Sequence, residues 1–159
     1  MITKCFGPRM FLSPDFQASG GGSAPLKGYK LKPEYTKPGR PEIIRKILVV
    51  DDEPLILNMV RRTFRGYNLE MVFVDPAKPI KEQVLDSVAK GDIDLIIMDG
   101  KMPGTSGPEL TRILRENGFA GYIAANTNMP EIEIEMLDEG ADFAINKLEI
   151  SNLAPFIET

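Results

Sequence analysis

Hydrophobic residues occur along the chain in short unbroken runs, and two of these runs end at acidic residues. The run at 47–50 is followed by Asp51 and Asp52, and the run at 95–98 is followed by Asp99. Unbroken runs rich in β-branched residues are typical of strands that are buried on both faces of a parallel sheet. Shorter runs lie at 70–74, 122–125 and 143–145. The pattern therefore predicts five strands.

Between these runs, hydrophobic residues recur at the spacing of amphipathic helices. The first stretch begins at Pro54, which suits a first helical turn, and ends at Gly66. Further helices are expected at 80–91, around 110–114, from a cap at Asn128 to Glu139, and in a short irregular helix capped by Ser151. Strands and helices in alternation predict an α/β fold with a doubly wound, five-stranded parallel sheet. A Pro-Gly loop is expected at 102–104.

The acidic residues that follow two of the strands are expected to share one pocket. Ligands of open α/β sheets bind beyond the carboxyl ends of the strands, so Asp51, Asp52 and Asp99 should converge there. Three clustered carboxylates call for a metal ion or a proton. The chain contains no histidine, the commonest general base and transition-metal ligand. Magnesium bound by oxygen ligands is therefore a better expectation than zinc.

Composition also indicates the compartment. The single cysteine, Cys5, allows no internal disulfide, which fits a reducing cytoplasm. No apolar stretch approaches the ~20 residues that a membrane span requires. Residues 1–10 lack the apolar region of a secretory signal peptide. We therefore expect a cytoplasmic protein with no membrane span.

The first part of the chain differs from the rest in composition and charge. Residues 1–46 contain nine Lys or Arg against three Asp or Glu, whereas residues 47–159 contain ten against twenty. Six of the 13 prolines and six of the 14 glycines precede Glu42. Such a stretch cannot bury enough apolar surface to offset its ordering entropy. We expect a flexible arm or linker at 1–43 and one folded domain at 44–159. A solvated linker is favoured over an arm that binds nucleic acid, acidic lipid or a partner.

Three motifs, in order and at predicted strand ends, resemble the receiver domain of two-component response regulators. They are Lys-Ile-Leu-Val-Val-Asp-Asp-Glu-Pro at 46–54, Leu-Ile-Ile-Met-Asp-Gly-Lys-Met-Pro-Gly at 95–104, and Gly-Ala-Asp at 140–142, seven residues ahead of Lys147. The resemblance extends from about residue 46 to 159 and does not cover the arm. It implies a flavodoxin-like fold and a phosphoacceptor signalling domain.

The resemblance also implies a role for each residue of the acidic pocket. Asp51 and Asp52 would bind Mg²⁺, together with Asp99 and the backbone carbonyl of Lys101. Asp99 would accept a phosphoryl group from a phosphohistidine on a histidine kinase or a histidine phosphotransfer protein. Lys147 would place its ammonium against the phosphoryl oxygens. Self-catalysed transfer and autodephosphorylation are the only catalysis expected, and output would follow by contact with another protein.

One position of the site has two candidates. The family places a Thr or Ser hydroxyl at the end of the fourth strand, where it donates to the phosphoryl group. Alignment on the strand puts Asn126 at that position, while a shift of one residue puts Thr127 there. Thr127 is slightly favoured because it supplies a hydroxyl. The amide of Asn126 can also donate, and Thr127 can instead cap the next helix.

Two departures from the family pattern leave other functions open. Ala144 stands where the family has an aromatic residue, and Leu148 replaces the family's proline. The neighbouring Phe143 should face the other side of the sheet. These departures favour, as an alternative, a receiver-fold interaction module that is never phosphorylated. A weaker alternative is a Mg²⁺-dependent phosphohydrolase, but such enzymes need a second acid two residues after the nucleophile, where this chain has Lys101.

Overall fold

The sheet has the strand order that brings the two acidic strand ends together. The computed structural model describes residues 43–157, so the expected arm lies outside the described residues except for residue 43. Five parallel strands are arranged in the order β2-β1-β3-β6-β7. They are β1 (Lys46–Val50), β2 (Glu70–Phe73), β3 (Leu95–Met98), β6 (Tyr122–Ala125) and β7 (Phe143–Ala144). The predicted doubly wound α/β fold is confirmed.

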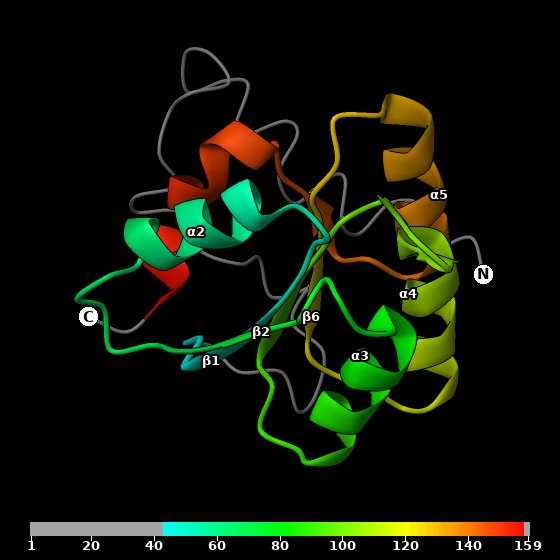
Figure 1. Ribbon diagram of the computed structural model, residues 1–159, viewed down its shortest axis with the longest axis horizontal. Helices are drawn as coiled ribbons and strands as arrows, with labels where there is room; N and C mark the ends of the chain where they lie inside the picture. Colours follow the sequence, from blue (N-terminus) through cyan, green and yellow to red (C-terminus); the bar gives the residue numbers. More distant parts are fainter. Residues whose placement is uncertain (1–42, 158–159) are drawn as a thin grey trace.

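Helices cover both faces of this sheet. The helices form a layer on each face, with the sheet between them (Figure 1). The first face carries α3 (Ile80–Ala89), α4 (Gly107–Glu116) and α5 (Pro130–Glu139), and the second carries α2 (Pro54–Thr63) and the 3₁₀ helix η2 (Lys147–Phe156). No helix within residues 43–157 has the length and apolar character that crossing a bilayer requires.

The alternation of side chains along each strand divides the core into two clusters. One cluster lies between the sheet and the helices α3, α4 and α5. The strands contribute Leu48, Val50, Ile96 and Met98, and the helices contribute residues that include Val84, Leu110, Leu114 and Met136. The other cluster lies between the sheet and the helices α2 and η2. The strands contribute Ile47, Val49, Leu95 and Ile97, and the helices contribute residues that include Leu57, Val60, Ile150 and Leu153. Because successive strand residues point to opposite faces, the unbroken runs are buried on both sides.

The expected Pro-Gly loop at 102–104 is present as a turn at Pro103 and Gly104, whereas Met102 belongs to a strand. Two short antiparallel strands, β4 (Lys101–Met102) and β5 (Thr105–Ser106), form a hairpin there. Gly104 has a φ of +78°, a conformation that favours glycine in a two-residue turn. The hairpin leads directly into α4, where the side chain of Ser106 accepts a hydrogen bond from the Glu109 N–H.

Two expected helix caps were wrong. The N-cap of α5 is Met129 rather than Asn128, and its N–H donates to Thr127 Oγ1 at 3.2 Å. The last helix begins at Lys147, four residues before Ser151, and its cap is Asn146, whose Oδ1 accepts a hydrogen bond from the Leu148 N–H. Asn146 is a good cap for the same reason as Ser151, because its side-chain oxygen can satisfy a free backbone N–H. The predicted irregularity is confirmed by the 3₁₀ form and a kink at Glu149.

Candidate functional site

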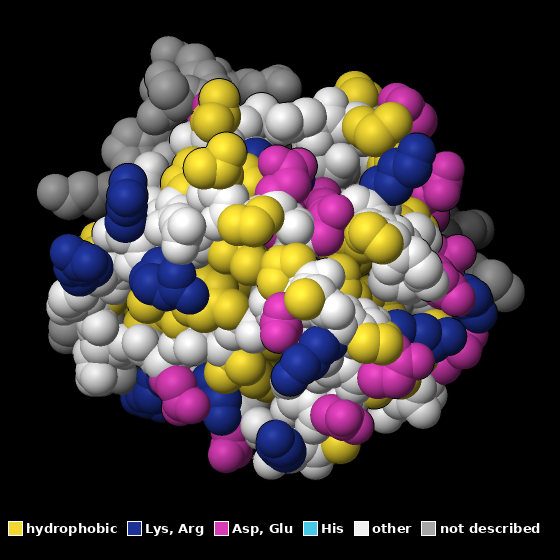
Figure 2. All heavy atoms as spheres, viewed as in Figure 1, with side chains coloured by type: hydrophobic (Ala, Val, Ile, Leu, Met, Phe, Trp, Pro, Cys, Tyr) yellow, Lys and Arg dark blue, Asp and Glu magenta, His cyan; other side chains and the backbone are white. Residues whose placement is uncertain are grey.

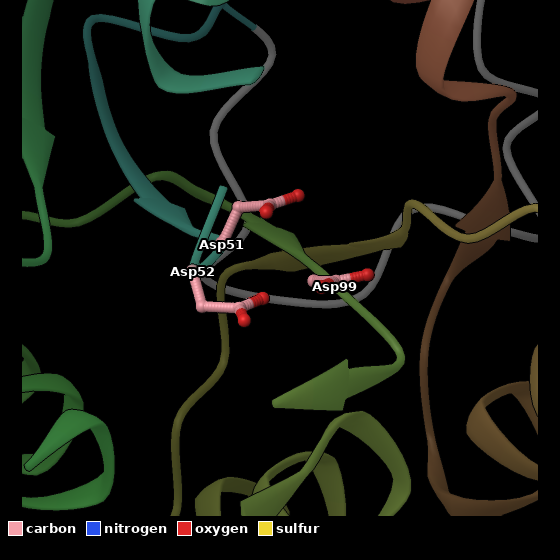
Figure 3. Close-up of side chains that lie close together, drawn as sticks. All are labelled: Asp51, Asp52 and Asp99. Atoms are coloured by element: carbon pink, nitrogen blue, oxygen red, sulfur yellow. The ribbon is translucent and has the colours of Figure 1, made fainter. Parts of the chain in front are cut away.

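Asp51, Asp52 and Asp99 form an acidic pocket at the carboxyl ends of β1 and β3. One carboxylate oxygen from each residue lies within 4.8 Å of the others. The three side chains point in the same general direction (Figure 3). Asp51 and Asp99 are 1% and 5% exposed, and Asp52 is half-buried. The convergence predicted from the two hydrophobic runs is therefore present.

Lys147 closes the acidic pocket from the start of η2. Its Nζ lies 3.1 Å from Asp51 Oδ2 and 3.1 Å from Asp99 Oδ1, and 3.7 Å from Glu53 Oε1. The lysine is 8% exposed, so its ammonium is held between the two buried carboxylates. The C-terminal part of the chain thus supplies the cation that balances the ends of β1 and β3.

Backbone N–H groups donate hydrogen bonds to two carboxylate oxygens of the pocket. The Glu53 N–H donates to Asp51 Oδ1 at 2.8 Å, and the Gly100 N–H donates to Asp99 Oδ1 at 2.8 Å. Lys147 contacts the same oxygen of Asp99. Within residues 43–157, Asp99 Oδ2 receives no hydrogen bond. This oxygen is the part of the carboxylate that is available for chemistry.

Burial dominates the electrostatics of the acidic pocket. It raises the pKa of Asp99 from 3.8 to about 6, with a further contribution from the charge of Asp51 and opposition from Lys147. The pKa of Asp51 is also raised, chiefly by burial. Burial alone would lower the pKa of Lys147, but its hydrogen bonds and charge interactions with Asp51 and Asp99 raise it. The pocket therefore holds more negative charge than one lysine neutralises.

The donor set of the acidic pocket fits a hard divalent cation. Three carboxylates converge, and oxygen ligands are those that Mg²⁺ prefers. The raised pKa of Asp99 shows that further positive charge beside it would be favourable. Among the described residues, no sulfur or imidazole ligand belongs to the cluster, which does not fit zinc.

The two candidates at the end of β6 have different surroundings. Asn126 is fully buried, and neither its Oδ1 nor its Nδ2 has a hydrogen-bond partner. Thr127 is 7% exposed, and its Oγ1 accepts the Met129 N–H. A Cβ added to Gly100 would lie 3.0 Å from Thr127 Oγ1 and 2.6 Å from Ile132 Cγ2, so Thr127 packs on the backbone next to Asp99.

The positions that depart from the family pattern lie at the end of β7 and in the first turn of η2. Ala144 packs against the cluster on the α5 side of the sheet, whereas Phe143 is buried in the cluster on the opposite side. The expectation that Phe143 cannot take the place of an aromatic at 144 is therefore confirmed. Leu148 is 82% exposed, and no cis peptide bond occurs within residues 43–157. The side chain of Lys101 is exposed at the start of β4.

Hydrophobic and acidic side chains lie side by side around the end of β1 on the face shown in Figure 2. Leu55 and Leu148, the two most exposed large hydrophobic residues described, are 81% and 82% exposed. Leu55 follows Asp51 and Asp52 by a few residues, and Leu148 is next to Lys147. Exposed hydrophobic residues therefore follow Asp52 and Lys147 closely in the chain.

Sequence reasoning did not identify three residues that shape the pocket. Glu53 contributes a backbone donor to Asp51 and a carboxylate near Lys147. Gly100 and Gly107 allow the backbone around Asp99 to pack closely, because a Cβ on Gly107 would lie 2.5 Å from the Asp99 carbonyl oxygen. The glycine directly after Asp99 was visible in the sequence, but the approach of Gly107 depends on tertiary packing.

A model of the response regulator receiver domain matches residues 47–154. Regulatory protein VanR of Enterococcus faecium is 33% identical over 103 residues, which cover 64% of this chain and 43% of VanR. DNA-binding response regulator MtrA of Mycolicibacterium smegmatis is 26% identical over 104 residues, which cover 65% of this chain and 44% of MtrA. The matched region thus spans less than half the length of these relatives.

Solved structures of receiver domains have the same fold. The response regulator TrrA of Thermotoga maritima, solved in complex with Mg²⁺-BeF, is 27% identical with a TM-score of 0.56, over 65% of this chain and 86% of TrrA. The receiver domain of Francisella response regulator 1452 is 22% identical with a TM-score of 0.57, over 70% of this chain and 96% of that domain. The second likeness shows the fold alone.

Proposed function

Because the chain belongs to the response regulator receiver domain family, whose members are phosphoacceptor domains of two-component signalling, we propose that Asp99 is its phosphoacceptor. The observation that carries this proposal is the position of the Asp99 carboxylate. It is buried, lies beside two further carboxylates, and contacts the ammonium of Lys147 through Oδ1. The other oxygen, Oδ2, remains available for attack.

The reaction proposed is a phosphoryl transfer from a phosphohistidine of a histidine kinase or histidine phosphotransfer protein. Asp99 Oδ2 attacks the phosphorus, a P–O bond forms, and the P–N bond to the donor imidazole breaks. The electron pair of that bond stays with the imidazole nitrogen, which takes up a proton. Attack requires an ionised carboxylate, so positive charge near Asp99 assists by lowering its pKa.

Asp51, Asp52 and Asp99 would hold Mg²⁺, together with the backbone carbonyl of Lys101. The ion would supply positive charge to the carboxylates and to the transferred oxygens. Lys147 would pair with the phosphoryl oxygens as a point charge, since its ammonium already contacts Asp99. Hydrolysis of the acyl phosphate would return Asp99 to its starting state, which makes the domain a timed switch rather than an enzyme.

We propose that the signal leaves by contact with another protein in the cytoplasm. The single cysteine of the sequence agrees with a reducing compartment. The part of the chain at 1–43 would act as a linker or arm, as its composition and positive charge suggest. No nucleic-acid partner is proposed for the domain, because residues 47–159 carry twice as many acidic as basic residues.

A second candidate function follows from Ala144. A receiver-fold interaction module would keep the acidic pocket for folding or binding without accepting a phosphoryl group. Ala144 is the observation in its favour, because the position on the α5 side of β7 has no aromatic side chain that could change its orientation with phosphorylation. The intact set Asp51, Asp52, Asp99 and Lys147 favours the phosphoacceptor.

Incubation with acetyl phosphate and Mg²⁺, followed by intact mass spectrometry, tests the proposal. We expect wild-type protein to gain the mass of one phosphoryl group and Asp99→Asn to gain none. Asp86→Asn, on the exposed surface of α3, serves as the matched control and should gain the same mass as wild type. Wild-type protein that gains no mass at any Mg²⁺ concentration would instead favour the interaction module.

A further inference from the structure

The outer face of α5 combines acidic side chains with an exposed isoleucine. Four exposed residues at the spacing i, i+3, i+4 and i+7 share this face, and they are Glu131, Ile134, Glu135 and Asp138. Ile134 is 44% exposed, and Met129, the N-cap of the same helix, is 40% exposed. The other side of α5 packs into the core. Carboxylates and apolar surface therefore lie together on the outer face of α5.

The negative charge of α5 is not balanced by nearby basic residues in the sequence. Residues 117–146 contain six Asp or Glu and no Lys or Arg. Within residues 43–157, neither Glu131 nor Glu135 forms an ion pair. In the neighbouring helix α4 (Figure 1), by contrast, the two acidic residues lie 3.7 Å from Lys81 and 3.6 Å from Arg112. Glu131 and Glu135 thus lack the counter-charge that the acidic residues of α4 have.

The placement of charge along α5 makes a basic ligand favourable. Glu131 and Glu135 are four residues apart, a spacing at which like charges on a helix repel each other. The last turn of α5 carries Asp138 and Glu139 and contains no basic residue, although the dipole at a helix C-terminus favours positive charge. Cations bound along the outer face of α5 would relieve both effects.

The chain itself contains a basic segment of complementary composition at 27–40. It has five Lys or Arg and one acidic residue, Glu34, together with Tyr29, Leu31 and Tyr35. The segment lies outside the described residues and ends three residues before they begin. Its cations are complementary to the carboxylates of α5, and its tyrosine and leucine side chains can cover Ile134.

The basic segment is attached at the edge of the sheet where α5 ends. β1 and β7 are parallel members of one sheet, so both begin at this edge. β7 begins at Phe143, three residues after Gly140, the C-cap of α5. β1 and β7 are three strand positions apart, or about 14 Å, whereas the extended segment spans up to about 45 Å. The segment therefore reaches α5, and its attachment raises its effective concentration there to about the millimolar range.

We propose that residues 27–40 bind the outer face of α5 in the same molecule. Their Lys and Arg side chains pair with Glu131 and Glu135, and their apolar side chains cover Ile134. The proposal concerns a surface other than the acidic pocket and holds whether or not Asp99 accepts a phosphoryl group. A protein that uses the outer face of α5 must first displace this segment.

Paramagnetic relaxation enhancement in the full chain tests the proposal. A nitroxide is attached at Thr36→Cys in a Cys5→Ser background, where it labels the single cysteine. We expect broadened amide signals in α5 and sharp signals in α2, which lies on the opposite face of the sheet (Figure 1). A mixture of isotope-labelled protein without nitroxide and unlabelled protein with nitroxide separates binding within one molecule from binding between copies.

Neutral variants test whether charge holds the segment on α5. The double variant Glu131→Gln, Glu135→Gln should lower the broadening of α5 at least about twofold, as for the loss of two exposed ion pairs. The double variant Glu82→Gln, Asp86→Asn, on the exposed surface of α3, is the matched control and should leave the broadening unchanged. Salt raised from about 0.1 M to about 1 M should also lower it, because the Debye length falls from about 10 Å to about 3 Å.

Broadening of α5 that only equals that of α2 would overturn the proposal. Broadening seen only in the mixture would also overturn it, because it would place a second copy on the helix. Equal broadening in wild type and in the Glu131→Gln, Glu135→Gln variant would overturn the pairing on which the proposal depends. None of these outcomes bears on Asp99, whose phosphorylation is tested separately by intact mass.

Discussion

Lys147 Nζ lies 3.1 Å from Asp99 Oδ1, so the first residue of η2 is paired with the residue that directly follows β3. The same ammonium contacts Asp51 Oδ2 at 3.1 Å. One buried lysine therefore holds two buried carboxylates that would otherwise repel each other. The charge of Asp51 raises the pKa of Asp99, and the hydrogen bond and charge of Lys147 oppose this rise.

Lys147→Met should destabilise the metal-free protein, because it leaves Asp51 and Asp99 buried beside each other without a counter-charge. Loss of one partner from a buried ion pair costs roughly 3 kcal/mol or more. Urea unfolding at about pH 7 with a chelator measures the change. Lys90→Met, at an exposed position after α3, is the control. Equal stability of the two variants would show that the buried pairing contributes nothing.

Stability of the metal-free protein should depend on pH through Asp99. Its pKa is about 6 when folded and 3.8 in the reference state, so the folded protein retains a proton that the unfolded chain has released between these values. The contribution of Asp99 therefore favours folding at low pH and is lost as the pH rises through that window. The loss is on the order of 3 kcal/mol, because one unit of pKa corresponds to about 1.4 kcal/mol.

Asp99→Asn has no such proton to lose. Unfolding free energies measured from about pH 4 to pH 7 should show Asp99→Asn gaining stability relative to wild type as the pH rises. A difference between the two proteins that stays constant across this range would mean that burial does not hold a proton on Asp99.

Mg²⁺ should stabilise the folded protein against unfolding. A ligand present at a hundredfold excess over its dissociation constant adds about 2.7 kcal/mol when it binds only the folded state. Asp52→Asn should lose most of this gain, because it removes one of the three carboxylates proposed to bind the ion. Asp52 is the best position for this test, since it is the least buried of the three and its change disturbs packing least. Thermal unfolding with and without Mg²⁺ measures it. A full Mg²⁺ response in Asp52→Asn would remove this residue from the metal site.

Gly107→Ala should destabilise the fold by about 1–3 kcal/mol, as expected for overpacking. The new Cβ would lie 2.5 Å from the Asp99 carbonyl oxygen and 2.7 Å from Met136 Sδ. Gly118→Ala is the comparison, because a Cβ there meets nothing within 4 Å and only its φ of +86° is unfavourable. If Gly107→Ala unfolds no more easily than Gly118→Ala in urea, the close approach of α4 to Asp99 does not matter for stability.

The sequence predicted the parts of this structure that local pattern determines. Hydrophobic runs at 47–50 and 95–98 gave β1 and β3, and the parallel arrangement then required Asp51 and Asp99 to meet. The cap of the last helix was predicted wrongly, because two residues that can cap a helix lie close together in the chain. Asn146 caps η2 although Ser151 has the same capping chemistry, so the sequence alone did not distinguish them.

The choice between Asn126 and Thr127 shows a different limit of the sequence. Both residues carry donors, and a shift of one residue in a loop leaves no trace in composition. Strand register decides the face, and register becomes visible only when Met98 is seen to pair with Ala125. The contact of Gly107 with the Asp99 carbonyl was equally inaccessible, because it depends on how α4 packs against the end of β3.

Reduction of the phosphorylated protein with borohydride tests the central claim most directly. Borohydride converts an aspartyl phosphate to homoserine, so peptide mass spectrometry can name the residue that carried the phosphoryl group. After incubation with acetyl phosphate and Mg²⁺, we predict homoserine at position 99 and aspartate unchanged at 51 and 52. Homoserine at another position, or at none while the protein remains folded, would contradict the assignment of Asp99 as the phosphoacceptor.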